Sequence, residues 1–170
     1  MSESAAGSTG IRTGLAALLL LAWAAGSLGC AGHEGAAGDA APRPDSPQAQ
    51  VEAALGRYAA LVLAMDHAGI AAMFAAEGAI VNDGQPPIRG PVKIRAFLES
   101  FSGYKVLAND METSRTVVEG ETAVQEGTYH QRVRTPEGKV LEVSGRFEVR
   151  WARSGPGEWL IEQMGTQPLR

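Results

Sequence analysis

Hydrophobic side chains recur at intervals of three and four residues after Ser46-Pro47, and this spacing is typical of one buried face of a helix. The members of this stripe are Val51, Leu55, Tyr58, Val62 and Met65. The hydroxyl of Ser46 can cap the first turn, and Pro47 lacks only an N–H that the first turn leaves unpaired. The pattern therefore predicts a long helix that begins at Pro47.

A shorter helix, a short strand and a third helix are predicted next. Asp66 can cap the second helix, whose apolar face continues up to Gly78. Residues 79–83 are a short extended run, and the two prolines in residues 84–87 end it because they oppose both helix and central-strand pairing. After Gly90, apolar side chains again recur at helical spacing. The chain thus places its predicted helices before its main sheet.

Turn-forming residues punctuate the second half of the chain at 119–121, 135–138 and 154–157, and they separate segments rich in β-branched residues. This pattern predicts four antiparallel strands. The clearest alternation runs through residues 143–151, which have apolar side chains on one face only. In residues 123–131 neither face is clearly apolar, so the inward face stays unassigned. The fold class is predicted as α+β, with three N-terminal helices packed against a curved antiparallel sheet.

The N-terminal segment has the pattern of a targeting signal. Residues 14–28 carry no charge, and this run is shorter than the ~20 residues of a transmembrane helix but suits the core of a signal peptide. Residues 27–30 resemble a bacterial lipobox, in which Cys30 would be acylated and become the new N-terminus. Serine stands where the lipobox prefers leucine, three residues before Cys30. An ordinary secretory signal, cut near residues 22–24, is the alternative.

These features divide the chain into three parts. We expect residues 1–29 to be a lipoprotein-type signal peptide, residues 30–46 a flexible tether, and residues 47–168 the folded domain. The tether is rich in Ala, Gly and Pro, so it cannot bury a core. The expected location is the cell envelope, with the exported protein attached to a membrane through the lipid on Cys30. A secreted or periplasmic soluble protein is the alternative.

Composition narrows the classes of partner. Nineteen Asp and Glu outnumber fifteen Lys and Arg, and the net charge of -4 without a dense basic run argues against a nucleic-acid partner. One Cys cannot form an internal disulfide, and with three His it cannot build a cysteine-rich zinc module. No metal-ligand spacing, phosphate-binding loop or nucleophile motif occurs, so we predict neither a metal nor a cofactor.

Five segments, taken in order, carry a resemblance to a known family. They are Arg57-Tyr58, residues 66–74, residues 79–83, residues 87–97 and residues 157–161. Together they resemble the SnoaL-like branch of the nuclear transport factor 2-like superfamily. The resemblance implies a cone-shaped domain with a pocket for a small-molecule ligand between sheet and helices, and a possible homodimer through the sheet. Members include isomerases, dehydratases, polyketide cyclases and proteins without known activity, so membership alone decides little about function.

The ketosteroid isomerases of this fold imply roles for particular positions. Tyr58 matches their oxyanion-hole tyrosine, and Asp83 matches their catalytic base after a one-residue gap. Without the gap Asn82 takes that position, and an amide cannot abstract a proton. Gly145 stands where those enzymes keep a donating aspartic acid, and loss of one such donor typically costs ~100 to 1,000-fold in rate. A structural interpretation also fits: Tyr58 as a core residue, Asp83 as a turn former.

The other pocket-lining candidates are apolar residues of the predicted helices and strands, together with one histidine. They are Met65, Phe74, Phe97, Phe101, His130, Phe147 and Trp151. His130 could form an acid-base pair with Glu126 if their face of the strand lines the pocket. His67, in contrast, is expected in an exposed first turn.

Two functions of different classes follow from these residues. The leading hypothesis is an exported lipoprotein whose domain binds a small, partly apolar ligand or a partner without efficient catalysis. The alternative is an isomerase or dehydratase type of enzyme that uses Asp83 as general base and Tyr58 as hydrogen-bond donor.

Overall fold

The computed structural model describes residues 43, 45–82 and 84–169. The predicted signal peptide, Cys30 and Asp83 lie outside the described residues. The elements are α1 (Pro47–Ala64), α2 (His67–Ala72), β1 (Phe74–Asn82), β2 (Ile88–Arg89), α3 (Pro91–Glu99), β3 (Lys105–Glu119), β4 (Thr122–Arg134), β5 (Val140–Gly155) and β6 (Glu158–Pro168). Within the described part of the chain, no helix is both long enough and apolar enough to cross a membrane.

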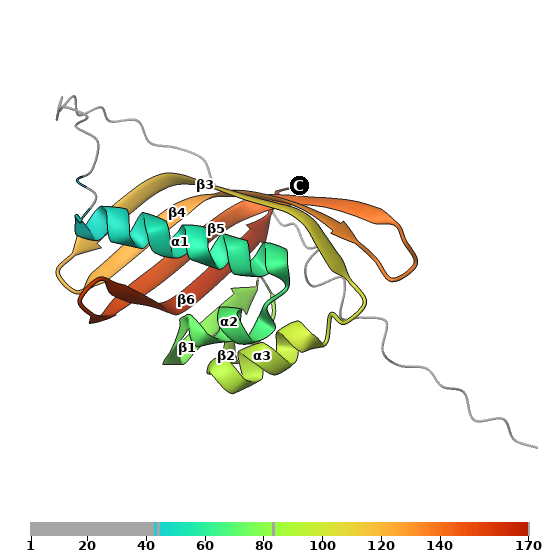
Figure 1. Ribbon diagram of the computed structural model, residues 1–170, viewed down its shortest axis with the longest axis horizontal. Helices are drawn as coiled ribbons and strands as arrows, with labels where there is room; N and C mark the ends of the chain where they lie inside the picture. The colour runs from blue at the N-terminus through green and yellow to red at the C-terminus, as the bar shows by residue number, and fades with distance from the viewer. Residues whose placement is uncertain (1–42, 44, 83, 170) are drawn as a thin grey trace, which may run out of the picture.

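Helix α1 begins where its sequence predicts. The backbone N–H of Ala49 donates to Ser46 Oγ at 3.2 Å, and Pro47 occupies the first turn, where no N–H is needed. The buried side of the helix carries Val51, Ala54 and Leu55. In Figure 1, α1 lies along the concave face of the sheet formed by β3 to β6. This packing closes one side of the space between helices and sheet.

The sheet has six strands in the order β2-β1-β6-β5-β4-β3. Strands β3 to β6 are antiparallel neighbours, as the turn pattern predicts. The expectation of a wholly antiparallel sheet is wrong, because β1 runs parallel to β6. Turn residues report the direction only of strands that a short turn joins, and no short turn joins β1 to β6, which lie far apart in the sequence. The fold is α+β with a curved mixed sheet.

The second helix is shorter than its apolar pattern predicts. It ends at Ala72, and Phe74 already starts β1. The register of β1 against β6 shifts between Phe74 and Ala79, so a bulged strand replaces the expected last helical turn. A Cβ on Gly78 would lie 2.5 Å from the carbonyl oxygen of Ile161, so glycine permits this close approach of the two strands.

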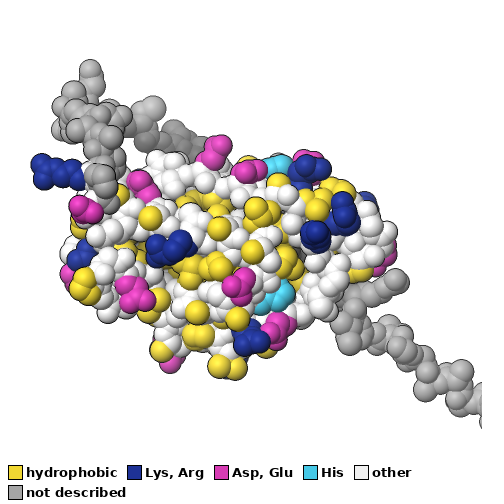
Figure 2. Space-filling view, viewed as in Figure 1, with side chains coloured by type: hydrophobic (Ala, Val, Ile, Leu, Met, Phe, Trp, Pro, Cys, Tyr) yellow, Lys and Arg dark blue, Asp and Glu magenta, His cyan; other side chains and the backbone are white. Residues whose placement is uncertain are grey.

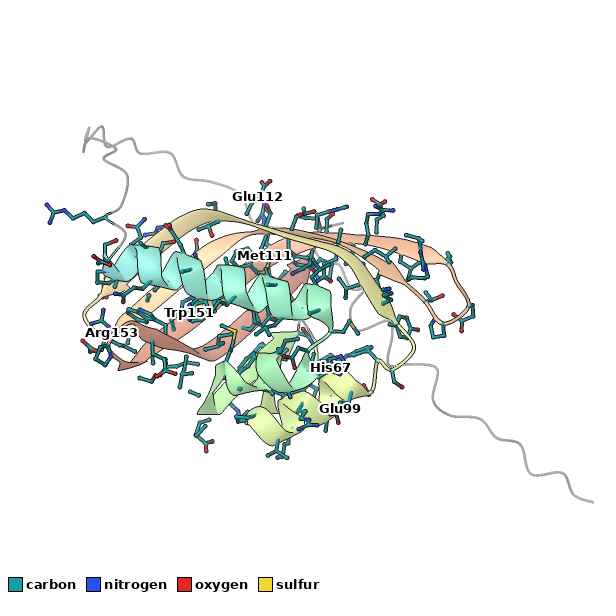
Figure 3. The ribbon with its side chains drawn as sticks, viewed as in Figure 1. His67, Glu99, Met111, Glu112, Trp151 and Arg153 are labelled. Carbon is teal, nitrogen blue, oxygen red and sulfur yellow. The ribbon has the colours of Figure 1, made fainter. Side chains whose placement is uncertain are left out.

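Alternation along β5 fixes which face of the sheet is dry. Val143, Phe147, Val149 and Trp151 are buried, and the charged residues between them are not, which confirms the predicted face. Residues directly opposite in an antiparallel pair share a face, and Tyr129 of β4 lies opposite Gly145. The odd-numbered residues of β4 therefore point inward. The same alternation appears on β3, where Met111 points under α1 and Glu112 points away from it (Figure 3).

Candidate functional site

A cavity of about 200 Å³ lies between the concave face of the sheet and the three helices. Most of its lining is apolar, and Figure 2 shows hydrophobic side chains gathered at the centre of this face of the molecule. The polar residues in the lining are Tyr58, His67, Asn82, Tyr104, Asn109, Tyr129, Gln131 and Thr166. No Asp, Glu, Lys or Arg belongs to the lining within the described part of the chain. The cavity is thus apolar with a small set of neutral polar groups.

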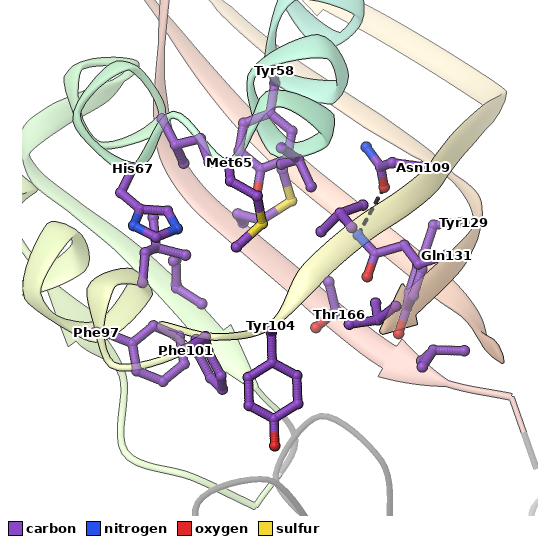
Figure 4. Close-up of a pocket in the computed structure, with 18 of the residues that line it drawn as sticks. Tyr58, Met65, His67, Phe97, Phe101, Tyr104, Asn109, Tyr129, Gln131 and Thr166 are labelled. Carbon is purple, nitrogen blue, oxygen red and sulfur yellow. Dashed lines mark hydrogen bonds between the residues drawn. The ribbon is translucent and has the colours of Figure 1, made fainter. Parts of the chain in front are cut away.

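Some of the candidate residues line this cavity. Tyr58 and Met65 reach it from α1 and its C-terminal end, and Phe97 and Phe101 reach it from α3 and the turn that follows (Figure 4). The two phenylalanine rings stack edge to face with centroids 5.1 Å apart. They form an aromatic wall at the side of the cavity opposite Tyr58 and Asn109 (Figure 4).

Other candidates lie elsewhere. Phe74 and Trp151 are almost fully buried in the hydrophobic core and do not belong to the cavity lining. Phe147 is also a core residue, and it borders a second, polar hollow that Glu126, Arg146 and Glu148 line. Hydrophobicity predicted burial for these three aromatic residues, but it did not tell which buried side chains border the cavity, as Tyr129 and Met164 do.

His130 is the clearest correction. Its side chain is 41% exposed on the outer face of the sheet, with Nε2 lying 3.2 Å from Glu142 Oε2. Glu126 lies on the same outer face because the neighbouring positions Gln125 and Tyr129 are buried on the inner one. These two residues therefore supply no acid-base pair to the cavity.

Tyr58 presents a neutral hydroxyl to the cavity. The side chain is half-buried against the hydrophobic core, and burial of its phenol raises the pKa of Tyr58 to about 12. Tyr129, from β4, is 7% exposed, and burial raises the pKa of its phenol as well. Neither hydroxyl makes a hydrogen bond with another described residue. Both phenols stay protonated at neutral pH, so each can donate a hydrogen bond to a bound molecule.

Gly145 gives Tyr129 its position. A Cβ at Gly145 would lie 2.6 Å from Cζ of the Tyr129 ring and 2.5 Å from the carbonyl oxygen of Gln167. The ring of Tyr129 therefore packs directly on the backbone of the neighbouring strand. The phenol of Tyr129, from the neighbouring strand β4, therefore covers Gly145, the position that lacks a donor side chain. The sequence of β4 alone does not reveal this contact.

Asn82 stands at the end of β1, and its side chain accepts a hydrogen bond of 3.1 Å from Thr166 Oγ1. Both residues line the cavity. Asp83 follows directly in the chain but lies outside the described residues. The amide of Asn82 is therefore the described group at this strand end, and an amide does not act as a general base.

His67 is half-buried and lies in the cavity lining, so the expectation of an exposed position is wrong. Met65 ends α1 in the left-handed conformation with φ of 56°, and the chain reverses so that α2 starts at His67. Asp66 holds this turn because its Oδ1 accepts a 2.8 Å hydrogen bond from the backbone N–H of Gly69. Figures 3 and 4 show His67 at the start of α2, pointing toward the cavity above α3.

Asn109 and Gln131 join the sheet to α1. Asn109 Nδ2 donates to the carbonyl oxygen of Ala59 at 3.1 Å, and Gln131 Nε2 donates to Asn109 Oδ1 at 2.7 Å. The two amides come from opposite positions on β3 and β4. Among the described residues, no group of three or more His, Cys, Asp or Glu side chains is placed to hold a metal ion. The polar chemistry of the described lining is that of phenols, amides, the hydroxyl of Thr166 and one imidazole.

A curved mixed sheet that helices close over one apolar cavity is the arrangement of the nuclear transport factor 2-like fold. The sequence model of the SnoaL-like domain matches residues 55–155, which is more than half of the chain. The chain therefore belongs to the SnoaL-like domain family, and the resemblance seen in the sequence is confirmed. No curated protein matches the sequence.

Solved structures share this fold at low sequence identity. A ketosteroid isomerase-like protein from Erwinia carotovora atroseptica is 17% identical with a TM-score of 0.65, over 72% of this chain and 96% of that one. A protein of unknown function from Mycobacterium tuberculosis is 25% identical with a TM-score of 0.58, over 72% and 76%. A protein from Catenulispora acidiphila, in complex with S-DNPA, is 13% identical with a TM-score of 0.58, over 71% and 91%.

Proposed function

We propose that the domain binds a small, uncharged and largely apolar molecule in the cavity between sheet and helices, without efficient turnover. The observation that carries the proposal is a cavity of about 200 Å³ with an apolar lining and no charged side chain among its described residues. Ligand pockets are mostly apolar with few well-placed polar groups. Engineered apolar cavities of roughly 150 Å³ hold benzene, so this volume suits a molecule of one or two rings.

The chemistry of the described lining favours binding over catalysis. Proton transfer needs a base, and the amides and protonated phenols of the cavity cannot serve as one, so His67 is the single candidate base among the described lining residues. The position of the missing donor, Gly145, carries the ring of Tyr129. These groups can orient a ligand by hydrogen bonds, which is the task of a binding protein.

The alternative function is an isomerase or dehydratase type of enzyme. The hydroxyl of Tyr58 in the cavity is the observation that favours it, because a protonated phenol can stabilise a developing oxyanion. Asp83 would be the general base and His67 a second candidate. Conversion of a bound compound by the wild type, abolished in both Asp83→Asn and Tyr58→Phe, would replace the binding proposal by this one.

A cavity-filling variant tests the binding proposal. Val106 lines the cavity on β3, whereas Val140 is 42% exposed on β5 and lies outside the lining. We expect Val106→Trp to abolish binding of 2-naphthol, measured by its fluorescence, and the matched Val140→Trp to leave binding unchanged. Equal binding by the wild type and both variants would show that the cavity is not the binding site.

The proposal includes the cellular location. The lipobox-like residues that end at Cys30 support an exported protein that a lipid attaches to a membrane of the cell envelope. A small-molecule-binding domain would then be held near the membrane by residues 30–46, whose composition is typical of a flexible tether.

A further inference from the structure

A chain of hydrogen bonds between amide groups runs from α1 to the wall of the cavity. It begins at the backbone carbonyl of Ala59, passes through Asn109 on β3 and ends at Gln131 on β4, with donor to acceptor distances of 3.1 and 2.7 Å. Asn109 and Gln131 are directly opposite residues of one antiparallel pair. The helix and two strands thus fix both side-chain amides.

The backbone carbonyl of Ala59 determines which group donates and which accepts in both hydrogen bonds. A backbone carbonyl can only accept, so Asn109 must turn its NH₂ group toward Ala59. The oxygen of Asn109 then faces Gln131, and two facing oxygens would repel each other. Gln131 must therefore turn its own NH₂ group toward Asn109. The assignment of nitrogen and oxygen in both amides is a consequence of the network, and a flipped Gln131 is excluded.

In this orientation the side-chain oxygen of Gln131 faces the cavity. Gln131 belongs to the cavity lining, and its Oε1 accepts no hydrogen bond from another described residue. Figure 4 shows the amide with its nitrogen toward Asn109 and its oxygen on the other side, among the residues that line the cavity. Gln131 is half-buried, so a ligand that fills the cavity would cover this acceptor, and a ligand that pairs with it is favoured because an acceptor left unpaired under a bound molecule is costly.

We infer that Gln131 determines specificity: its Oε1 selects a ligand with a neutral hydroxyl or N–H group, and Asn109 is the residue that positions it. The inference rests on the proposed binding function. A cationic donor is disfavoured, because no carboxylate belongs to the described part of the lining. The two phenols supply donors, so Gln131 contributes the complementary acceptor, and the cavity recognises a molecule that both donates and accepts.

The test compares two probes that differ in one donor. 2-Naphthol and 2-methoxynaphthalene have the same fused rings and carry one oxygen at the same position. This oxygen is a hydroxyl in 2-naphthol and an ether in 2-methoxynaphthalene, so only 2-naphthol can donate a hydrogen bond. We expect the wild type to bind 2-naphthol about tenfold more tightly, the size typical of one hydrogen bond to an acceptor that the bound ligand shields from water. In Gln131→Met, which keeps the length but not the acceptor, we expect the ratio to fall to about one and the affinity for 2-methoxynaphthalene to be unchanged.

Matched variants separate a specific role of Gln131 from a general effect of the substitution on the folded protein. Gln48→Met makes the same change on the exposed side of α1, where Gln48 Nε2 donates to Glu52, and it should keep the tenfold ratio. Asn109→Leu leaves Gln131 in place but without its partner, so the ratio should fall only in part, while binding of 2-methoxynaphthalene persists. Should Gln131→Met fail to fold, the side-chain amide resonance of Gln131 in the wild type should shift with 2-naphthol and not with 2-methoxynaphthalene.

The outcomes distinguish this inference from the proposed function. Binding of neither probe would refute the proposed function and the inference with it. Equal binding of both probes, lost in Val106→Trp, would keep the binding function and overturn the role of Gln131. A tenfold preference that persists in Gln131→Met would also overturn it, because another group would then accept from the ligand. Loss of the preference in Gln131→Met but not in Gln48→Met supports the inference.

Discussion

Substitution of Gly145 by alanine probes the closest contact near the cavity. The added Cβ would approach Cε1 and Cζ of the Tyr129 ring, the latter at 2.6 Å, and the carbonyl oxygen of Gln167 at 2.5 Å. Ordinary van der Waals contact begins at 3.4 Å, so neighbours must move by about an ångström. The ring can tilt toward the cavity, but Gln167 is part of β6 and pairs with β5, so its carbonyl can move only with the strand.

Two effects of opposite sign decide how much Gly145→Ala changes the free energy of unfolding. Alanine is favoured over glycine in a strand by roughly 0.5 to 1 kcal/mol, because glycine loses more backbone entropy on folding. Overpacking of a well-packed site costs about 1 to 3 kcal/mol. Gly145 does not have a positive φ, so no backbone strain adds to this cost. The clash exceeds the gain in propensity, and we expect Gly145→Ala to lower the free energy of unfolding by about 1 to 2 kcal/mol.

Urea unfolding followed by tryptophan fluorescence measures this change, and Gly56→Ala is the matched control. A Cβ at Gly56 on α1 meets no atom within 4 Å, so that variant should be more stable than the wild type by roughly 0.5 to 1 kcal/mol. Gly145→Ala should also bind 2-naphthol more weakly, since Tyr129 moves into the cavity. If Gly145→Ala proved as stable as Gly56→Ala, the ring of Tyr129 could not lie on β5 as described.

Three further predictions concern the pH response, a helix cap and the lipid. The pKa of Tyr58 lies at about 12 in the folded protein and near the ordinary value of 10 when unfolded, so the folded state binds this proton more tightly and stability should fall as pH rises from about 10 to 12. A spectrophotometric titration should show one tyrosine that ionises at higher pH than the others, and this step should be absent in Tyr58→Phe. Ionisation of every tyrosine near pH 10 would contradict this prediction. Asp66→Ala removes the cap of α2 and should cost about 1 kcal/mol by urea unfolding, whereas Asp66→Asn should cost less. Cys30→Ala should release the protein from the membrane fraction, and a processed variant that stayed in that fraction would refute the lipid anchor.

Local signals predicted the helix starts and the hairpins. The capping groups of Ser46 and Asp66 act within one turn, and the structure has both caps. The spacing of apolar residues did not predict where α2 ends, because Phe74 is equally suited to the next helical turn and to a buried strand. The choice depends on β6, which pairs with β1 and lies far away in the sequence. Long-range pairing therefore overrides the local period at this position.

The polar cavity residues of β4, Tyr129 and Gln131, were missed because this strand was interpreted without its neighbour. Alternation within β4 is symmetric: either Tyr129 and Gln131 or His130 and Glu126 could face inward. The dry face of β5 breaks this symmetry through the hairpin at residues 135–138. In that hairpin Gln131 pairs with Val143, and opposite residues share a face.

The register of this one hairpin is therefore enough to bring Tyr129 and Gln131 inside and leave His130 outside. It also changes the meaning of the two glutamines on β4. On an exposed face they would be ordinary surface residues. On the inner face Gln125 is fully buried, with Nε2 donating to Thr113, and Gln131 is part of the cavity lining. A polar side chain at a position that packing would fill with an apolar one indicates a specific partner: Gln131 Nε2 has Asn109, and the proposed partner of its Oε1 is the ligand.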